Sequence, residues 1–128
     1  MMRIKRPETA FGTPVGKATK PVKNKSYLSW LHDLPCCVCG AVGVDAAHVS
    51  MAKPEYGHES RGLRTKVGDR WALPLCRDCH IKQHDQGEWK FWFKRDPHLL
   101  CLILFGIYSD YNEEGIEPAV KIIQEGDW

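Results

Sequence analysis

The chain has 128 residues, of which 43% are hydrophobic, and its formal net charge is +2, so it has the size of one domain with tails. The longest apolar run, residues 99–107, is interrupted by Gly106 and is much shorter than the roughly 20 residues that span a bilayer. The basic N-terminus also lacks the apolar segment of a secretory signal. We therefore expect a cytoplasmic protein with no membrane partner.

Residues 1–25 are the most basic part of the chain, with seven Lys or Arg against Glu8 alone. Their prolines and weak apolar periodicity predict an extended or disordered arm. Residues 96–128 instead hold one Lys against seven acidic residues. This asymmetry favours a polyanion such as DNA as a partner at the N-terminal end; a solubilising tail has the same composition.

Residues 26–128 are predicted to form one domain. Ser26 can cap a helix that runs to Leu34 and is stopped by Pro35. The elements predicted after it are a strand (42–49), a long functional or mobile loop (50–68), a second strand (71–75) and helical segments over 78–86, 88–95, 97–108 and 116–124. The dense aromatic residues of 88–95 are expected to form core rather than a platform for stacked bases.

Two Cys-x-x-Cys pairs precede and follow the predicted strands; they are Cys36 with Cys39 and Cys76 with Cys79. Such pairs can supply four thiolates to one tetrahedral structural zinc, and small cores often need a metal of this kind. A disulfide framework is the alternative, but disulfides are typical of secreted chains. Cys37 could stand in for Cys36, although only Cys36 has the right spacing. Cys101 is expected in the core.

Three histidines accompany these pairs. His48 ends the first predicted strand, and His80 and His84 follow the second cysteine pair. Residues four apart project from one face of a helix, so His80 and His84 can share a metal. The alternatives are that His48 is an ordinary strand residue, that His80 is a fourth zinc ligand and that His84 is a solvated helix residue.

Taken together, this pattern resembles the HNH endonucleases, especially short phage and prophage members such as the recombination-enhancement nucleases. The resemblance covers residues 34–95 and rests on Cys36-x-x-Cys39, Asp45-Ala46-Ala47-His48-Val49, Asp69, Leu75-Cys76-x-x-Cys79-His80 and His84. It implies an α+β fold: a small zinc-stapled ββα-metal (HNH, treble-clef-like) domain with flanking helices, a C-terminal helical extension and the basic N-terminal arm.

The resemblance also implies a function. It predicts a metal-dependent DNA endonuclease that hydrolyses phosphodiester bonds in single- or double-stranded DNA, is encoded by a phage or prophage, acts in the bacterial host cytoplasm and is linked to recombination or DNA processing. In this family one divalent cation binds the scissile phosphate and the departing 3′ oxygen, while a histidine deprotonates water. His48 matches that histidine, and an imidazole suits the role of general base. Asp69, the second candidate catalytic residue, occupies the position nearest the family's central Asn; otherwise it is a turn residue.

The metal-binding helix positions of the family match His80 and His84. Ala47 departs from the pattern, because the family commonly has Asp or His there as a further ligand. The replacement ligand would be Asp45, the tentative choice, or His58 or Asp69. Mg²⁺ needs few protein ligands, whereas two imidazoles favour Zn²⁺, Mn²⁺ or Ni²⁺. We expect structural Zn²⁺ and catalytic Mg²⁺ or another divalent cation.

Candidate contacts to DNA phosphates come from the long loop and the following helix; they are Arg61, Arg64, Lys66, Arg70, Arg77 and Lys82. A solvated charged surface is the alternative. The competing function is a non-catalytic zinc module that binds DNA or a protein, which Ala47 favours and the three histidines disfavour. A Cys-x-x-Cys redox protein is disfavoured by the absence of a βαβ pattern.

Overall fold

The fold is built around one antiparallel hairpin, seen in a computed structural model that describes residues 22–58 and 67–128. The hairpin consists of β1 (Val44–His48) and β2 (Ala72–Cys76). Val44 pairs with Cys76 and His48 pairs with Ala72. One end of the hairpin therefore carries a cysteine and the other end carries the candidate catalytic histidine.

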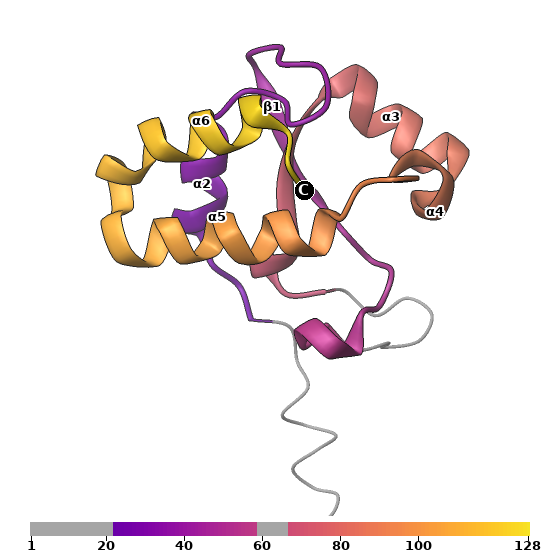
Figure 1. The fold of residues 1–128 in the computed structure, drawn as a ribbon, viewed down its shortest axis with the longest axis horizontal. Coiled ribbons are helices and arrows are strands. Elements are labelled where there is room, and N and C mark those ends of the chain that lie inside the picture. The colour runs from indigo at the N-terminus through magenta and orange to yellow at the C-terminus, as the bar shows by residue number, and fades with distance from the viewer. Residues whose placement is uncertain (1–21, 59–66) are drawn as a thin grey trace, which may run out of the picture.

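Within the described ranges, 22–58 and 67–128, five helices surround the hairpin on two sides. In Figure 1 they are α2 (Lys25–Leu31), α5 (Pro97–Tyr111) and α6 (Ile116–Glu125) to the left of the strands, and α3 (Arg77–Gln86) and α4 (Glu88–Phe91) to the right. Short 3₁₀ turns are η1 (Pro54–Tyr56), η2 (Asp69–Trp71) and η3 (Asn112–Gly115). The predicted α+β class, both strands and the helices following the second cysteine pair are confirmed, with ends shifted by a few residues.

The N-terminal end of the domain differs from the prediction. Asn24, not Ser26, caps α2, because its side chain accepts a 3.0 Å hydrogen bond from the Tyr27 N–H. The backbone of Asn24 donates to Asp69 Oδ2 at 2.7 Å, and the Asp69 N–H donates to the Val22 carbonyl. Residues 22–25 therefore belong to the folded domain and not to the arm. The rest of the predicted arm lies outside the described residues.

The core lies between the hairpin, α2 and α5. The predicted apolar face of the first helix is buried in full: Tyr27, Trp30, Leu31 and Leu34. The Tyr27 ring meets the Phe105 ring of α5 edge-on, with centroids 5.0 Å apart. Cys101 is buried beside the Ala72 carbonyl, which confirms its expected place in the core. These contacts fix the hairpin on the α2–α5 side and leave its α3 side for the site.

The aromatic segment after α3 was expected to form core, and this is correct for Trp92 and in part for Phe91, which is partly buried against the core. Trp92 is 2% exposed and donates from Nε1 to Gln83 Oε1. Trp89 and Phe93 are 77% and 71% exposed. The reason is that α4 is a single turn at the periphery, so only one side of it meets the domain.

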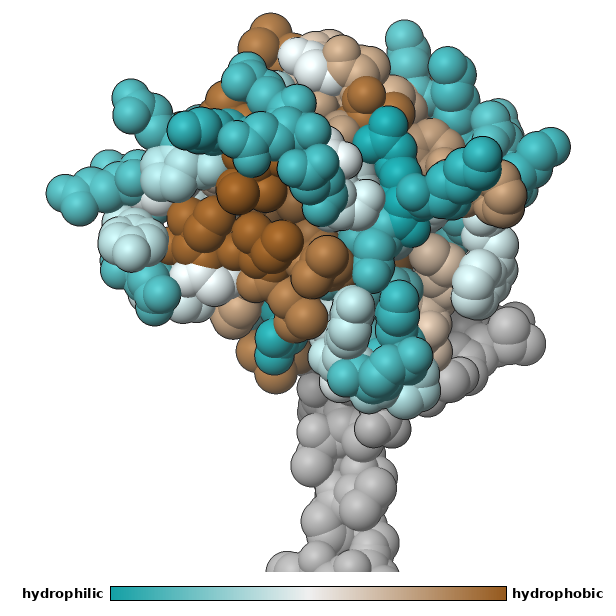
Figure 2. Space-filling view, in the orientation of Figure 1, coloured by the Kyte–Doolittle hydropathy of each residue, from teal (hydrophilic) through white to brown (hydrophobic). Residues whose placement is uncertain are grey.

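The surface is unevenly apolar. On the face shown in Figure 2, a hydrophobic area lies over α5 and α6, while the side formed by α3 and α4 is more hydrophilic. Apolar side chains of these two helices pack on the core but remain partly exposed; they include Leu102, Ile107, Ile116, Val120 and Ile122. In the part of the chain that the structure describes, no helix combines the length and apolarity needed to cross a membrane.

Candidate metal centre and catalytic site

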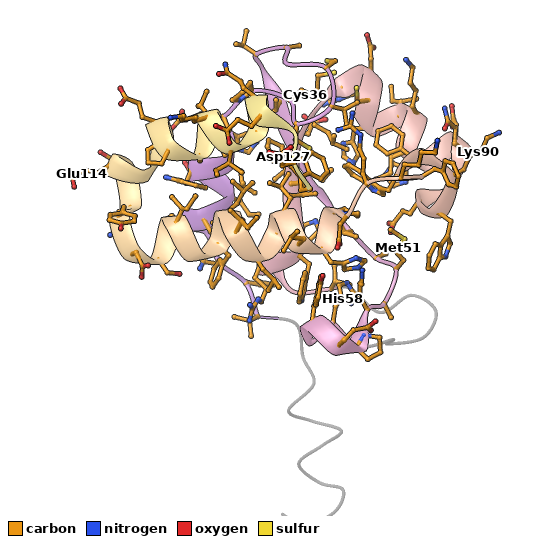
Figure 3. All side chains as sticks on the ribbon, in the orientation of Figure 1. Cys36, Met51, His58, Lys90, Glu114 and Asp127 are labelled. Atoms are coloured by element: carbon orange, nitrogen blue, oxygen red, sulfur yellow. The ribbon has the colours of Figure 1, made fainter. Side chains whose placement is uncertain are left out.

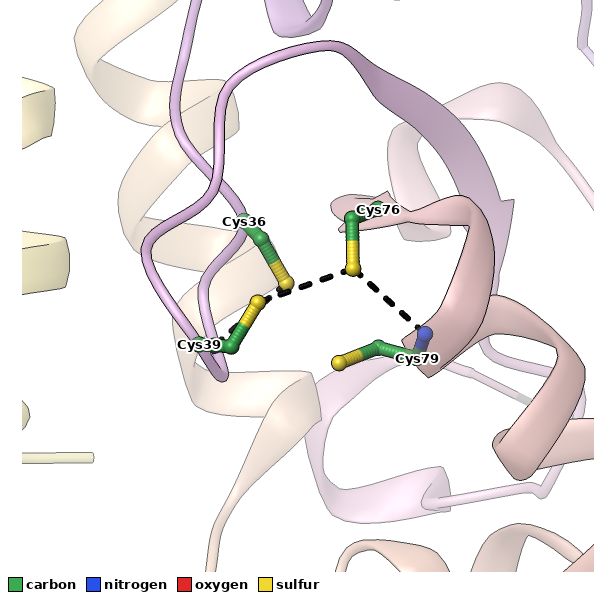
Figure 4. Close-up of side chains that lie close together, drawn as sticks. All are labelled: Cys36, Cys39, Cys76 and Cys79. Atoms are coloured by element: carbon green, nitrogen blue, oxygen red, sulfur yellow. Dashed lines mark hydrogen bonds between the residues drawn. The ribbon is translucent and has the colours of Figure 1, made fainter.

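The two cysteine pairs meet at the end of the hairpin where β2 passes into α3. Cys36 and Cys39 come from the loop after α2, Cys76 ends β2, and Cys79 lies in the first turn of α3. All four Sγ atoms lie within 4.8 Å of one another, and Figure 4 shows them gathered between the loop and the helix. The predicted four-cysteine cluster is thus assembled.

The geometry of this cluster fits a zinc ion. Tetrahedral Zn–S bonds of about 2.3 Å place sulfur atoms about 3.8 Å apart, and Cys39 Sγ and Cys76 Sγ are 3.5 Å apart. This distance is far longer than the about 2.05 Å of a disulfide. Backbone N–H groups of Val38, Cys39 and Cys79 point at the sulfurs of Cys36 and Cys76, 3.4–3.5 Å away. The four residues could hold a metal ion such as zinc.

Ionisation of all four thiols together would require a cation between them. Burial raises the pKa of Cys36, but backbone N–H donors, that of Cys39 first, outweigh it and bring the pKa to about 7. Burial, followed by hydrogen bonding to Cys76, raises the pKa of Cys79. Four adjacent thiolates would repel one another without a positive charge between them. Cys37 stays outside this cluster: it is buried, burial raises its pKa well above the ordinary value, and its N–H donates to the Pro74 carbonyl.

At the opposite end of the hairpin, His48 and Asp69 form a hydrogen-bonded pair. His48 Nε2 and Asp69 Oδ1 are 2.9 Å apart, and the side chains are 34% and 13% exposed. Burial raises the pKa of Asp69, but hydrogen bonds from the Asn24 N–H and from His48 more than offset this, so the pKa is below the ordinary value. An ionised carboxylate can only accept, so Nε2 carries the proton and Nδ1 of a neutral ring keeps its lone pair.

This pair predicts an acid-sensitive contribution to stability. Because the pKa of Asp69 is lowered in the folded state, the stabilisation is present above the ordinary Asp value of about 4 and is lost as pH falls through the lower folded value. The amide in Asp69→Asn does not titrate there. Urea unfolding below about pH 5 should therefore show a smaller fall in unfolding free energy for Asp69→Asn than for the wild type. An equal fall in unfolding free energy for the two proteins would contradict the assignment of this effect to Asp69.

The helix histidines lie together on α3. The ring centroids of His80 and His84 are 5.0 Å apart. His80 Nδ1 lies 3.1 Å from Asp45 Oδ2, and Arg77 contacts the same carboxylate through Nε at 2.8 Å and through Nη2 at 3.3 Å. Arg77 first and then His80 lower the pKa of Asp45 to about 2. With Nδ1–H donated to Asp45, His80 would present its Nε2 lone pair to a metal.

These contacts show what surrounds Asp45, the tentative metal ligand, which remains a prediction. Both of its carboxylate oxygens are engaged by Arg77, and one is shared with His80, so in this structure Asp45 is placed to orient the His80 ring. Over residues 22–58 and 67–128, the four cysteines are the only group of three or more His, Cys, Asp or Glu whose ligand atoms all lie within 4.8 Å of one another. His80 and His84 are therefore a pair of neighbouring imidazoles that belongs to no larger cluster of this kind among the described residues.

A carboxylate connects the two ends of this site. Glu88, at the start of α4, accepts hydrogen bonds from the backbone N–H groups of Ser50 and Met51 at 2.8–2.9 Å. Ser50 is two residues from His48, and Glu88 is four residues from His84. The end of β1 is thus fastened beside the end of α3, which brings the neighbourhood of His48 to that of His84.

Two of the remaining histidines, His58 and His98, are buried and structural. His58 and His98 are both 3% exposed, and each Nε2 lies 2.7 Å from a backbone carbonyl, that of Val49 for His58 and that of Met51 for His98. His58 is therefore excluded as the replacement metal ligand, and Asp69 is occupied by His48. Together with Glu88, the two buried histidines hold the segment after His48. No sequence pattern indicated this.

The candidate DNA-contacting residues have varied surroundings. Arg61, Arg64 and Lys66 lie outside the described residues. The Arg70 guanidinium lies over the rings of Trp71 and Phe105, 5.2 Å from each centroid. Arg77 is paired with Asp45, and Lys82 is exposed on α3.

A comparison with protein families matches the part of the chain that holds the residues described above. A family model described as "Protein of unknown function (DUF968)" matches residues 6–101, a range that includes both cysteine pairs, His48, His80 and His84. "Uncharacterized protein YdfU" of Escherichia coli (strain K12) is 36% identical over 78 residues, which are 61% of this chain and 20% of that protein. The chain thus spans about a fifth of the length of this relative. No solved structure gives a significant match.

Proposed function

Since the chain belongs to the DUF968 family, whose function its description leaves open, we propose from the site geometry that it is a metal-dependent DNA endonuclease of the HNH type. The observation that carries the proposal is the hydrogen bond between His48 Nε2 and Asp69 Oδ1 at 2.9 Å. A zinc module used only for binding has no need of a half-exposed histidine whose tautomer is set by a carboxylate. A general base has that need.

His48 would act at Nδ1. With Nε2–H donated to Asp69, the Nδ1 lone pair takes a proton from a water molecule as that water attacks the scissile phosphate. Asp69 then stabilises the charged imidazolium, because its carboxylate stays ionised at neutral pH. The backbone N–H of Asn24 and the capped end of α2 hold Asp69 in place. His48 is thus the proposed catalytic residue, and Asp69 is a positioning residue.

His80 and His84 would hold the divalent cation. When bound, this cation would neutralise charge on the scissile phosphate and on the departing 3′ oxygen. Asp45 keeps the His80 ring in the tautomer that can bind metal, and Arg77 keeps Asp45 ionised. Two imidazoles favour Mn²⁺, Ni²⁺ or Zn²⁺ over Mg²⁺, so the proposed enzyme is expected to work best with Mn²⁺ or Ni²⁺.

The arrangement of elements supports the HNH assignment. An antiparallel hairpin runs into a helix at a four-cysteine cluster, which is the order ββα that the sequence resemblance implies. The proposed setting follows from the same resemblance: a phage or prophage protein that acts on DNA during recombination or processing. Arg70, Lys82 and the N-terminal arm would supply phosphate contacts.

The second candidate is a non-catalytic zinc module that binds DNA or a protein. Ala47 favours it, because this residue is 1% exposed and offers no ligand atom where the HNH family commonly has one. The two candidates are separated by incubating the purified protein with circular single-stranded DNA and with supercoiled plasmid. Mg²⁺, Mn²⁺, Ni²⁺ and Zn²⁺ are added in turn. Cleavage supports the endonuclease, and binding without cleavage under any metal supports the module.

His84→Ala should raise the metal concentration needed for cleavage without changing the general base. Removing one of two imidazoles weakens binding of the cation, so activity should be low at micromolar Mn²⁺ and should partly return at millimolar Mn²⁺. The measurement is the plasmid nicking rate over a Mn²⁺ titration. Gln86→Ala, another exposed position on α3, is the matched control and should titrate like the wild type. A His84→Ala curve that overlays the wild type would remove His84 from the metal site.

A further inference from the structure

Two large aromatic side chains stand in solvent beside a cavity near the proposed catalytic end. Trp89 and Phe93 are 77% and 71% exposed. Both line a cavity of about 470 Å³, the other walls of which include Met51 from the segment after β1. Figure 3 shows Met51 and Lys90 on the side of the molecule that carries α4. Tryptophan is highly buried on average, so two exposed aromatic rings beside one cavity make this surface a candidate ligand site.

The charges around the cavity fit an anionic chain. Lys90, Lys94 and Arg95 are exposed on or after α4, and Lys94 and Arg95 line the cavity itself. Of the nearby carboxylates, Glu55 lines the cavity and is exposed, whereas the other two are engaged in hydrogen bonds. Glu88 accepts from two backbone N–H groups, and Asp96 accepts from the Lys53 ammonium, the Tyr56 hydroxyl and the Leu99 N–H. The surface thus offers two exposed aromatic side chains with cations beside them. Lys94 Nζ lies 5.7 Å from the Phe93 ring centroid, and the Arg95 guanidinium lies 5.1 Å from that of Trp128.

The backbone next to Phe93 forms a turn with an energetically unfavourable conformation. Lys94 has a φ of 71°, a left-handed conformation that a non-glycine residue adopts at some cost. The turn follows directly from Trp92, which is buried and hydrogen bonded to Gln83. A rigid anchor therefore stands next to an exposed aromatic ring, which keeps the exposed surface in a defined shape.

The cavity is also within reach of the proposed reaction. Met51 is three residues from His48, so their Cα atoms are at most about 11 Å apart. That separation corresponds to about three base steps of one DNA strand at 3.4 Å each. A base at the cavity would therefore lie within about three nucleotides of a phosphate at His48.

From these observations we propose that Trp89 and Phe93 form a stacking platform for an unpaired base of single-stranded DNA. The proposal rests on the proposed endonuclease function for its substrate, and it specifies that substrate as DNA with an unpaired segment next to the cleaved phosphate. Bases inside a duplex do not expose the ring face that aromatic side chains stack on, whereas unpaired bases do. Lys90, Lys94 and Arg95 would follow the backbone of the same strand.

The test is a binding titration with a 12-nucleotide single strand and with a duplex of the same sequence, followed by fluorescence anisotropy of a label on the DNA and without added divalent metal. Stacking is worth about 1–3 kcal/mol per base, so Trp89→Ala should weaken single-strand binding by about 5- to 150-fold and duplex binding by less than about twofold. Trp89→Phe, which keeps an aromatic face, should bind the single strand close to wild type. Tyr111→Ala, at the far end of α5 and 56% exposed, is the matched control and should bind like the wild type.

Zinc content and thermal unfolding confirm that each variant is folded. Unchanged single-strand binding by Trp89→Ala and by Phe93→Ala would overturn the proposal, as would equal losses for single strand and duplex. An RNA strand that binds more tightly than DNA and loses its affinity in Trp89→Ala would overturn the assignment to DNA. Cleavage is scored separately. If the wild type shows the stacking effect but cleaves DNA with no metal, the endonuclease proposal is wrong and the stacking platform stands. If the wild type cleaves DNA and Trp89→Ala binds the single strand like the wild type, the endonuclease proposal stands and the stacking platform is wrong.

Discussion

Cys76→Ser should leave the domain unfolded. Cys76 joins β2 to α3 and supplies one of the four sulfurs that gather the loop after α2, the hairpin and the helix. Structural zinc contributes on the order of 10 kcal/mol in small zinc peptides, which is comparable with the whole stability of a typical domain, about 5–15 kcal/mol. The measurement is far-ultraviolet circular dichroism together with zinc content. The wild type should hold one zinc per chain and should lose its signal when a strong chelator is added.

Cys101→Ala is the matched control for this result. Cys101 is equally buried but lies in α5, outside the cluster, so its replacement should cost about 1 kcal/mol and should leave the zinc content at one per chain. A Cys76→Ser protein that is well folded and free of metal would contradict the hypothesis that a structural zinc at the four cysteines holds the domain together.

The second large effect concerns His48. His48→Ala should reduce the rate of DNA cleavage by about 10²- to 10⁴-fold, the usual contribution of a general base. Folding and zinc content should be retained, because the His48 side chain is 34% exposed and lies at the other end of the hairpin from the cysteines. The measurement is the plasmid nicking rate at saturating Mn²⁺, with DNA binding followed separately.

His32→Ala is the control for His48→Ala, since His32 is an exposed histidine at the end of α2 and should cleave like the wild type. If His48→Ala cuts DNA at the wild-type rate, the catalytic assignment is wrong. A loss of cleavage together with a loss of zinc would instead point to a structural role for His48.

The parts of this molecule that the sequence predicts are those set by local spacing. The two Cys-x-x-Cys pairs identify the cluster because a two-residue spacing positions each pair for one metal. The buried face of α2 follows from the i, i+3, i+4, i+7 pattern that begins at Tyr27. The end of α3 follows from Gly87. His80 and His84 meet because they are four residues apart on one helix.

The parts that the sequence does not predict depend on contacts between distant residues. The Asn24 N–H binds Asp69 across 45 positions, so neither the start of the folded domain nor the anchoring of Asp69 can be found from local periodicity. Arg77 binds Asp45 across 32 positions, a contact that local spacing does not reveal and that places Asp45 to orient His80. Trp89 and Trp92 look alike in sequence, and only the position of α4 at the periphery decides which one is buried.

The most direct test of the central claim is the chemistry of the DNA ends. Wild-type protein with one zinc per chain is incubated with supercoiled plasmid and Mn²⁺, and the nicked product is then treated with DNA ligase and ATP. Attack of water with departure of the 3′ oxygen leaves a 5′ phosphate and a 3′ hydroxyl, so ligase should reseal the nicks without any other treatment. Plasmid that stays intact with Mg²⁺, Mn²⁺, Ni²⁺ and Zn²⁺, or nicks that ligase cannot reseal, would contradict the account.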